Sequence, residues 1–77
     1  MVKLENKQII THMIGIDRNW APYSHFVMYD YVMNDTYYLL IKVRKWASQA
    51  LQHEYRIGAS IAGFKEESDM MLFMLRW

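Results

Sequence analysis

The end of the chain limits the possible folds more than any other segment. A short acidic stretch there leads into ten residues, ending at Trp77, that are apolar on almost every side of a helix. Such a helix must be packed on both sides or covered by a partner. One face has the i, i+3, i+4, i+7 spacing of a core face and consists of Met70, Phe73, Met74 and Trp77. The other side, which has no evident cover within the chain, consists of Met71, Leu72 and Leu75.

The composition points to an interacting domain. With 77 residues the chain is expected to form a single domain, 1–77, near the lower size limit for a core that folds unaided. It has no cysteine, so neither disulfides nor thiolate metal sites can reinforce that core. Yet 53% of its residues are hydrophobic, more apolar surface than one small core hides. We therefore expect a homodimer or another protein to cover the surplus.

The charge and the hydrophobic runs exclude several classes of partner. The formal net charge is +1, so the sequence has no basic excess for binding nucleic acid or an anionic membrane. Uncharged apolar runs such as Tyr37 to Ile41 are far shorter than a membrane-spanning helix. The N-terminus is polar and lacks the hydrophobic region of a signal peptide. We expect a cytoplasmic protein.

The first half of the chain is expected to contain two strands. Gln8 to Ile16 has isoleucines on both faces, as in a strand covered on both sides. Asp17 to Pro22 is a turn or loop, and its proline is the only one in the chain. His25 to Met33 is rich in aromatic and β-branched residues and is the second strand.

The segment after this strand allows two interpretations. Asn34 and Asp35 fit the turn of a hairpin, with Thr36 to Val43 returning as a strand. Alternatively, Asp35 caps a helix that runs to about Glu54. We favour the helix for the later part, because the apolar residues from Leu39 to Leu51 share one helical face. For residues 36–42 strand and helix both remain open.

The last third is expected to supply one strand and one helix. Tyr55 to Phe64 is a strand with unusually small residues, which would let the terminal helix pack closely against it. That helix begins at Glu66 or Ser68, where the acidic residues complement its dipole. The predicted fold is α+β: a small single-sheet sandwich of order β-β-α-β-α with its helices on one face.

The order of residue types at the C-terminus also carries a resemblance. The relevant residues are Phe64, Glu66, Glu67, Asp69, Leu72, Phe73, Leu75 and Trp77. This segment resembles one that recurs at the C-termini of small, mostly uncharacterised proteins of tailed bacteriophages, whose upstream helix often carries a Trp that Trp46 could match. Met70 and Met74 replace a small residue and a Lys of that pattern. The resemblance implies a phage origin and no particular activity.

No residue pattern indicates an enzyme, a metal site or a cofactor. The histidines His12, His25 and His53 lack the spacing of metal ligands on a helix. Ser24 and His25 are neighbours, but a strand would point them to opposite faces. The three glycines form no phosphate-binding loop. We expect no catalytic residues, no metal and no cofactor.

Two surface features are candidate binding sites. Lys42, Arg44 and Lys45 beside Trp46 make a basic-aromatic patch that could hold single-stranded nucleic acid, although such alternation is also typical of a solvated helix face. The proline-containing loop has the composition of a protein-binding hot spot, with Arg18, Trp20 and Tyr23 as the contact residues.

The sequence as a whole favours a non-enzymatic, phage-encoded protein-binding module. We expect it to modulate or inhibit a host protein, for example a component of defence or transcription, in the cytoplasm of the infected bacterial cell. Met71, Leu72 and Leu75 are the candidate oligomer face. A small virion component, such as a decoration or tail protein, is the alternative, and a nucleic-acid-binding module is third.

Overall fold

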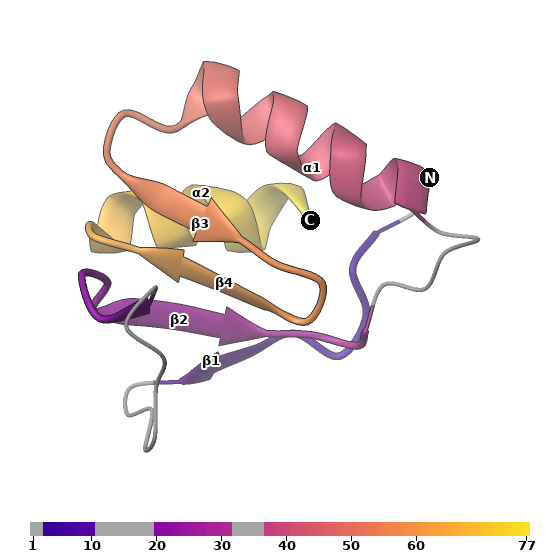
Figure 1. The fold of residues 1–77 in the computed structure, drawn as a ribbon, viewed down its shortest axis with the longest axis horizontal. Helices are drawn as coiled ribbons and strands as arrows, with labels where there is room; N and C mark the ends of the chain where they lie inside the picture. Colours follow the sequence, from indigo (N-terminus) through magenta and orange to yellow (C-terminus); the bar gives the residue numbers. More distant parts are fainter. Residues whose placement is uncertain (1–2, 11–19, 32–36) are drawn as a thin grey trace.

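The computed structural model describes residues 3–10, 20–31 and 37–77. These residues form a small α+β fold with a four-stranded antiparallel sheet and two helices (Figure 1). The elements in chain order are β1 (Gln8–Ile10), β2 (His25–Met28), α1 (Tyr37–Ala50), β3 (Tyr55–Ile57), β4 (Ile61–Phe64) and α2 (Glu67–Arg76).

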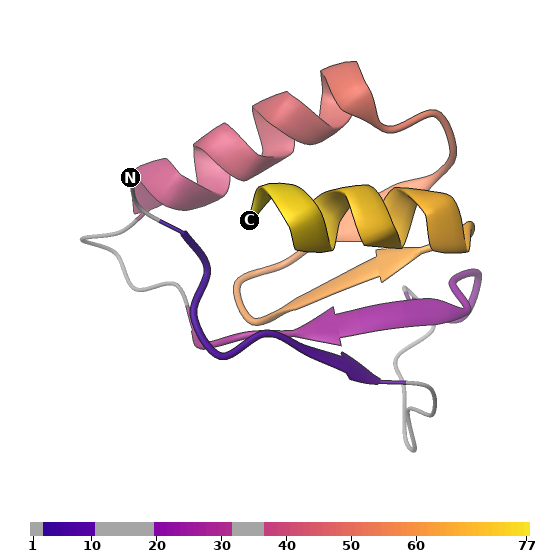
Figure 2. The same cartoon turned by 180° about the vertical axis from the view of Figure 1, so that it is seen from behind.

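The strands lie in the order β1-β2-β4-β3, so β1 and β3 are the two edges. Val27 of β2 is opposite Ile9 on one side and Ala62 on the other, and Ala62 in turn is opposite Ile57. Helix α2 packs against β2 and β4, while α1 lies beside α2 toward the β3 edge (Figure 2). The β1 edge is therefore the one farther from α1.

A single hydrophobic core lies between the sheet and the helices. Its centre is Phe73 of α2, which is completely buried. The ring of Phe73 has three aromatic neighbours, at centroid distances of 5.2 Å to Phe64, 6.1 Å to Tyr29 and 6.5 Å to Trp46. Both helices and three strands contribute to this core, whose other members include Val27, Leu39, Leu40, Val43, Ala47, Ile57, Ala62, Met70 and Trp77.

The prediction of one strand over Tyr55–Phe64 was wrong, because this segment is a hairpin of two strands. The N–H of Gly58 donates to the carbonyl of Ile61 at 2.8 Å and closes a tight turn through small residues. The buried Tyr29 holds this turn, since its hydroxyl donates toward the carbonyls of Gly58 and Ile61. The order is thus β-β-α-β-β-α, one strand more than expected.

The expected packing of the terminal helix against the small-residue segment holds for Ala62 but not for Gly63. Phe64 and Ala62 of β4 point into the core beneath α2. Alternation along the strand directs Gly63 to the opposite face of the sheet. A Cβ atom at Gly63 would meet the rings of Trp20 and Tyr23, at 3.0 and 3.1 Å. Gly63 therefore makes room for these two aromatic side chains, while Ala62 packs beneath α2.

The remaining boundaries differ from the predictions in detail. Helix α1 includes Tyr37 to Ala50, so a returning strand is excluded for this part and the helix ends before Glu54. The strand expected from His25 to Met33 ends at Met28. Of the strand expected from Gln8 to Ile16, β1 covers Gln8–Ile10, and 11–16 lie outside the described residues, as do 17–19 and 32–36. The terminal helix begins at Glu67, with Glu66 as its N-cap residue.

Candidate functional site

The side chains of Trp20 and Tyr23, two of the predicted contact residues, are partly buried against the sheet. Their rings meet edge to face, with centroids 6.2 Å apart, above the bare backbone of Gly63. The guanidinium of Arg56 lies over the Trp20 ring, 5.0 Å from its centroid. The Tyr23 hydroxyl donates to the carbonyl of Tyr55 at 3.3 Å. Both aromatic residues thus have a packing role within the fold.

Arg18, the third residue predicted for this loop, lies outside the described residues. The structure places Trp20 and Tyr23 together but adds Arg56 as their cationic neighbour. From sequence, Arg56 and Gly63 were placed in one strand, so the hairpin pairing that sets them opposite each other, and with it the contact of Arg56 with Trp20, was not predicted.

Helix α2 exposes the three apolar side chains that were predicted as an oligomer face. Leu75 exposes 77% of its surface to solvent, and Met71 and Leu72 expose 45% each. On the other side of the same helix Met70 and Phe73 are buried in the core. The helix is therefore anchored firmly while its outer side remains apolar and open to solvent.

The two flanks of α2 differ in what they face. The flank toward α1 carries Phe73 and Trp77, whose rings lie 6.5 and 6.2 Å from the ring of Trp46. Met71 and Leu75, one turn apart, lie on the side of α2 opposite Phe73. The ammonium of Lys7 donates to the carbonyl of Met74 at 2.9 Å. Burial, and then the positive charge of Lys3, lower the pKa of Lys7.

The edge strand β1 exposes a large apolar side chain, Ile9, in a segment that was predicted to be a strand covered on both sides. Ile9 is opposite Val27 and so points to the same face of the sheet as α2, but 47% of its surface is exposed. We refer to the exposed side chains of Ile9, Met71 and Leu75 together as the β1–α2 edge surface. The alternation of isoleucines in the sequence could not reveal it, because it depends on β1 lying at the edge of the sheet.

The three cations of the predicted basic patch have different surroundings. Arg44 donates to the carbonyl of Ile57 from Nε at 3.2 Å and from an Nη atom at 2.9 Å, which directs its guanidinium to the β3 edge. Lys42 and Lys45 are exposed on α1. One of the three cations therefore has a structural partner, and the other two are on the solvent-exposed surface.

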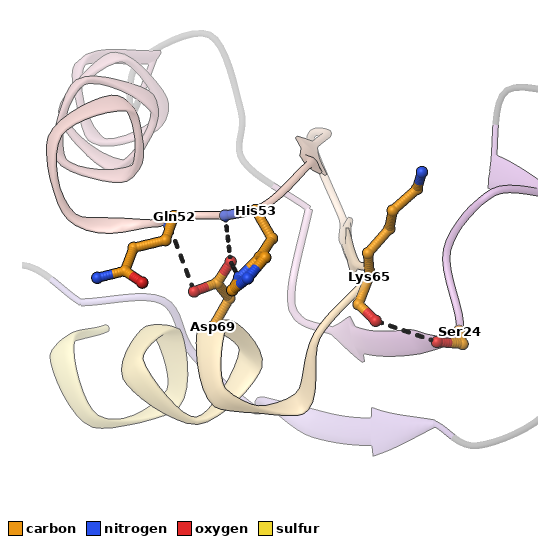
Figure 3. Close-up of polar contacts among 5 residues, drawn as sticks. All are labelled: Ser24, Gln52, His53, Lys65 and Asp69. Carbon is orange, nitrogen blue, oxygen red and sulfur yellow. Dashed lines mark hydrogen bonds and ion pairs between the residues drawn. The ribbon is translucent and has the colours of Figure 1, made fainter.

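A buried carboxylate connects α2 to the loop after α1 (Figure 3). Asp69 is 2% exposed and accepts hydrogen bonds from the backbone N–H groups of Gln52 at 3.5 Å and His53 at 3.0 Å. The Nδ1 atom of His53 lies 3.4 Å from the same carboxylate. The sequence predicts a charge in the first helical turn at Asp69, but no local pattern distinguishes a buried carboxylate from an exposed one.

The other polar contacts are also structural. The Ser24 hydroxyl donates to the carbonyl of Lys65 at 3.5 Å (Figure 3). Lys65 pairs with Glu54 at 2.8 Å, and the hydrogen bond to Glu54 raises the pKa of Lys65. Within residues 3–10, 20–31 and 37–77, no three His, Asp or Glu side chains converge in a way that could hold a metal ion. His12 is not among these residues.

Comparisons with protein-family models, curated proteins and solved structures find no match for this chain. Across its described part, neither helix is long and apolar enough to cross a membrane.

Proposed function

We propose that this chain is a non-enzymatic protein-binding module, encoded by a tailed bacteriophage, that modulates or inhibits a host protein in the bacterial cytoplasm. The observation that carries this proposal is the exposed side of α2. Met71, Leu72 and Leu75 expose 45%, 45% and 77% of their surfaces on a helix whose core contacts are complete. Burying an apolar side chain of this size contributes about 1.5–3 kcal/mol, so covering three partly exposed ones contributes on the order of 3 kcal/mol to binding.

The C-terminal resemblance supports the phage origin and, with it, the class of partner. Among the residues that carry it, Phe64, Asp69, Phe73 and Trp77 are buried and serve the fold. Leu72 and Leu75 are exposed, so packing gives no reason for their apolar character. An apolar pair that the fold does not use is consistent with a binding role.

The structure changes which residues we assign to the contact. Trp20 and Tyr23 are partly buried over Gly63, and they are the second choice as contact residues. The exposed side of α2 is the first choice, because its apolar side chains have no comparable packing role.

The test is a capture experiment with matched variants. The purified chain, immobilised through a tag at its N-terminus, is incubated with bacterial lysate, and bound proteins are identified by mass spectrometry. Leu75→Glu should abolish capture of a stoichiometric partner, while Tyr38→Glu on α1 should retain it; Leu75 and Tyr38 are similarly exposed, at 77% and 78%. If no stoichiometric partner is captured, or if both variants bind equally well, the proposal is wrong.

A small virion component remains a second candidate on one observation. Apolar side chains are exposed at a second place, on α1, where Tyr38 and Ile41 keep 78% and 43% of their surfaces. A repeating assembly needs two different surfaces on each copy, because head-to-tail contacts join unlike patches. In that case light scattering should detect large assemblies that Tyr38→Glu and Leu75→Glu each dissolve.

A further inference from the structure

The two edges of the sheet differ in how their outward backbone groups are covered. The N–H of Gly58 donates to the carbonyl of Ile61, and the N–H of Lys65 donates to the carbonyl of Glu54. These bonds show that Glu54 and Gly58 turn their backbone groups toward β4. Because an antiparallel ladder alternates, Tyr55 and Ile57 direct their backbone groups away from β4. Arg44 donates to the carbonyl of Ile57, and Tyr23 donates to that of Tyr55. Both outward carbonyls of β3 therefore have a side-chain donor, one from each face of the sheet.

The β1 edge has no such cover in the described part of the chain. The N–H of Tyr29 donates to the carbonyl of Ser60, so Tyr29 turns its backbone groups toward the side of β4. Because every second residue of an antiparallel strand bonds to the same neighbour, Val27 also turns its backbone groups toward β4. The neighbours of Val27, Phe26 and Met28, then point theirs toward β1. Ile9, opposite Val27, therefore directs its N–H and C=O outward, where no described strand lies beside β1. An edge of this kind is a template for pairing with another chain.

The outward backbone of Ile9 belongs to the β1–α2 edge surface. The side chains of Ile9, Met71 and Leu75 keep 47%, 45% and 77% of their surfaces there. The hydrogen bond from Lys7 to the carbonyl of Met74 joins the residue just before β1 to the last turn of α2. The surface thus offers unpaired backbone groups and apolar side chains together.

We propose that a second copy of this chain covers the β1–α2 edge surface, with the two β1 strands pairing antiparallel about a two-fold axis at Ile9. This inference rests on the proposed protein-binding function and names a first partner for it. Such an interface uses the same patch on both copies. Each Ile9 donates to and accepts from its counterpart, and the two side chains lie together between the Met71 and Leu75 flanks of the two α2 helices.

The residues that would oppose one another are compatible. With the axis at Ile9, Gln8 of one copy faces Ile10 of the other, so no like charges meet along β1. Lys7 remains engaged with Met74 of its own chain. Two backbone hydrogen bonds and a few apolar side chains make an interface below about 1,200 Å², the class that gives weak and reversible association. We expect a dissociation constant on the order of 100 µM.

Sedimentation velocity over about 5 to 500 µM tests this, since that range brackets the expected constant. The weight-average mass should rise from monomer toward dimer. Ile9→Pro removes the outward N–H and leaves the pairing of Gln8 and Ile10 with β2, because proline is tolerated on a free strand edge. It should weaken association at least tenfold. Far-UV circular dichroism and thermal unfolding verify that each variant is folded.

Two matched pairs of variants identify the surface. Ile9→Lys should weaken association, while Ile41→Lys should not; these isoleucines are 47% and 43% exposed. In the second pair, Leu75→Glu should weaken association, while Tyr38→Glu should leave it unchanged. Monomer mass at all concentrations overturns the inference, as does association that survives Ile9→Pro in a folded variant.

The outcomes separate this inference from the proposed function. If the chain stays monomeric but captures a lysate protein in a Leu75-dependent way, the dimer is refuted and the binding function stands. If the Ile9-dependent dimer forms but no other protein is captured, the dimer is supported and the host-directed function fails.

Discussion

The carboxylate of Asp69 accepts a hydrogen bond from the backbone N–H of His53 at 3.0 Å, across 16 positions of the chain. This contact joins the first turn of α2 to the loop that follows α1. The same carboxylate accepts the N–H of Gln52, so the loop satisfies its backbone donors without continuing the helix. The clamp holds α1 beside α2 and thereby fixes the orientation of the exposed side of α2.

Replacing this carboxylate should destabilise the domain. Asp69→Ala leaves two loop N–H groups without their acceptor, and we expect the free energy of unfolding to fall by about 2–3 kcal/mol. Urea denaturation followed by circular dichroism measures the change. Glu67→Ala is the matched control, since it removes an exposed acid from the same helical turn and should cost only about 0.5 kcal/mol. Equal losses for the two variants would show that Asp69 has no clamp role.

The backbone of Gly63 makes a second prediction possible. A Cβ atom there would lie 3.0 Å from Cε3 of Trp20 and 3.1 Å from Cβ and Cγ of Tyr23. Gly63→Ala should therefore displace these rings and reduce the free energy of unfolding by about 1–3 kcal/mol. In a Trp20→Ala background the same substitution should cost less, because one of the two obstacles is gone.

A double-mutant cycle measures this coupling. The interaction energy between Gly63→Ala and Trp20→Ala should exceed about 0.5 kcal/mol, the usual limit for independent sites. As a control, the interaction energy between Gly63→Ala and Leu75→Ala should be near zero, because Leu75 is an exposed residue of α2. Additive effects of Gly63→Ala and Trp20→Ala would mean that the ring does not rest on this glycine.

Periodicity predicted the elements whose signal is local. The apolar positions from Leu39 to Ala47 marked α1, and the acidic residues before Met70 marked the start of α2. It could not predict the β3–β4 hairpin. The turn from Gly58 to Ile61 contains no proline or asparagine, and Tyr29, far away in the sequence, helps to hold it.

The candidate site was predictable only in part, for the same reason. Met71, Leu72 and Leu75 were identified because they lie opposite the core spacing of one helix. Ile9 was missed, since its exposure follows from the strand order, which pattern alone does not give. Trp20 and Tyr23 were expected on an exposed loop, but Gly63 provides a place for them on the sheet.

The cover of the β3 edge leads to a third prediction. Arg44→Gln removes the two hydrogen bonds to the carbonyl of Ile57. Because Arg44 is exposed and its charge is screened by solvent, we expect a loss of only about 1 kcal/mol in the free energy of unfolding. The clearer effect should be aggregation on heating, through the uncovered edge.

Lys45→Gln is the control for this prediction, because it removes the same charge from the same helix away from the edge. Turbidity during a thermal ramp, recorded at equal protein concentration, compares the two variants. If both aggregate at the same temperature as the unmodified protein, Arg44 does not protect the edge.

The buried hydroxyl of Tyr29 predicts how stability depends on alkaline pH. Burial raises the pKa of Tyr29 well above its ordinary value, and the opposing influence of Arg44 is smaller. In the unfolded chain the phenol ionises near pH 10, whereas the folded protein keeps its proton. The stabilisation from this group is therefore complete below about pH 10 and declines above it, by up to about 1.4 kcal/mol per pH unit.

Tyr29→Phe should change both the level and the slope of this dependence. At pH 7 the variant should be about 1–2 kcal/mol less stable, because the turn carbonyls of Gly58 and Ile61 lose their donor. Above pH 10 its stability should fall less steeply, so the two curves converge. For Tyr38→Phe, which alters a side chain that is 78% exposed, the curve of unfolding free energy against pH should run parallel to that of the unmodified protein. Guanidinium denaturation at pH 7 to about 11 tests this, and a parallel decline for Tyr29→Phe would rule out the buried phenol as the cause.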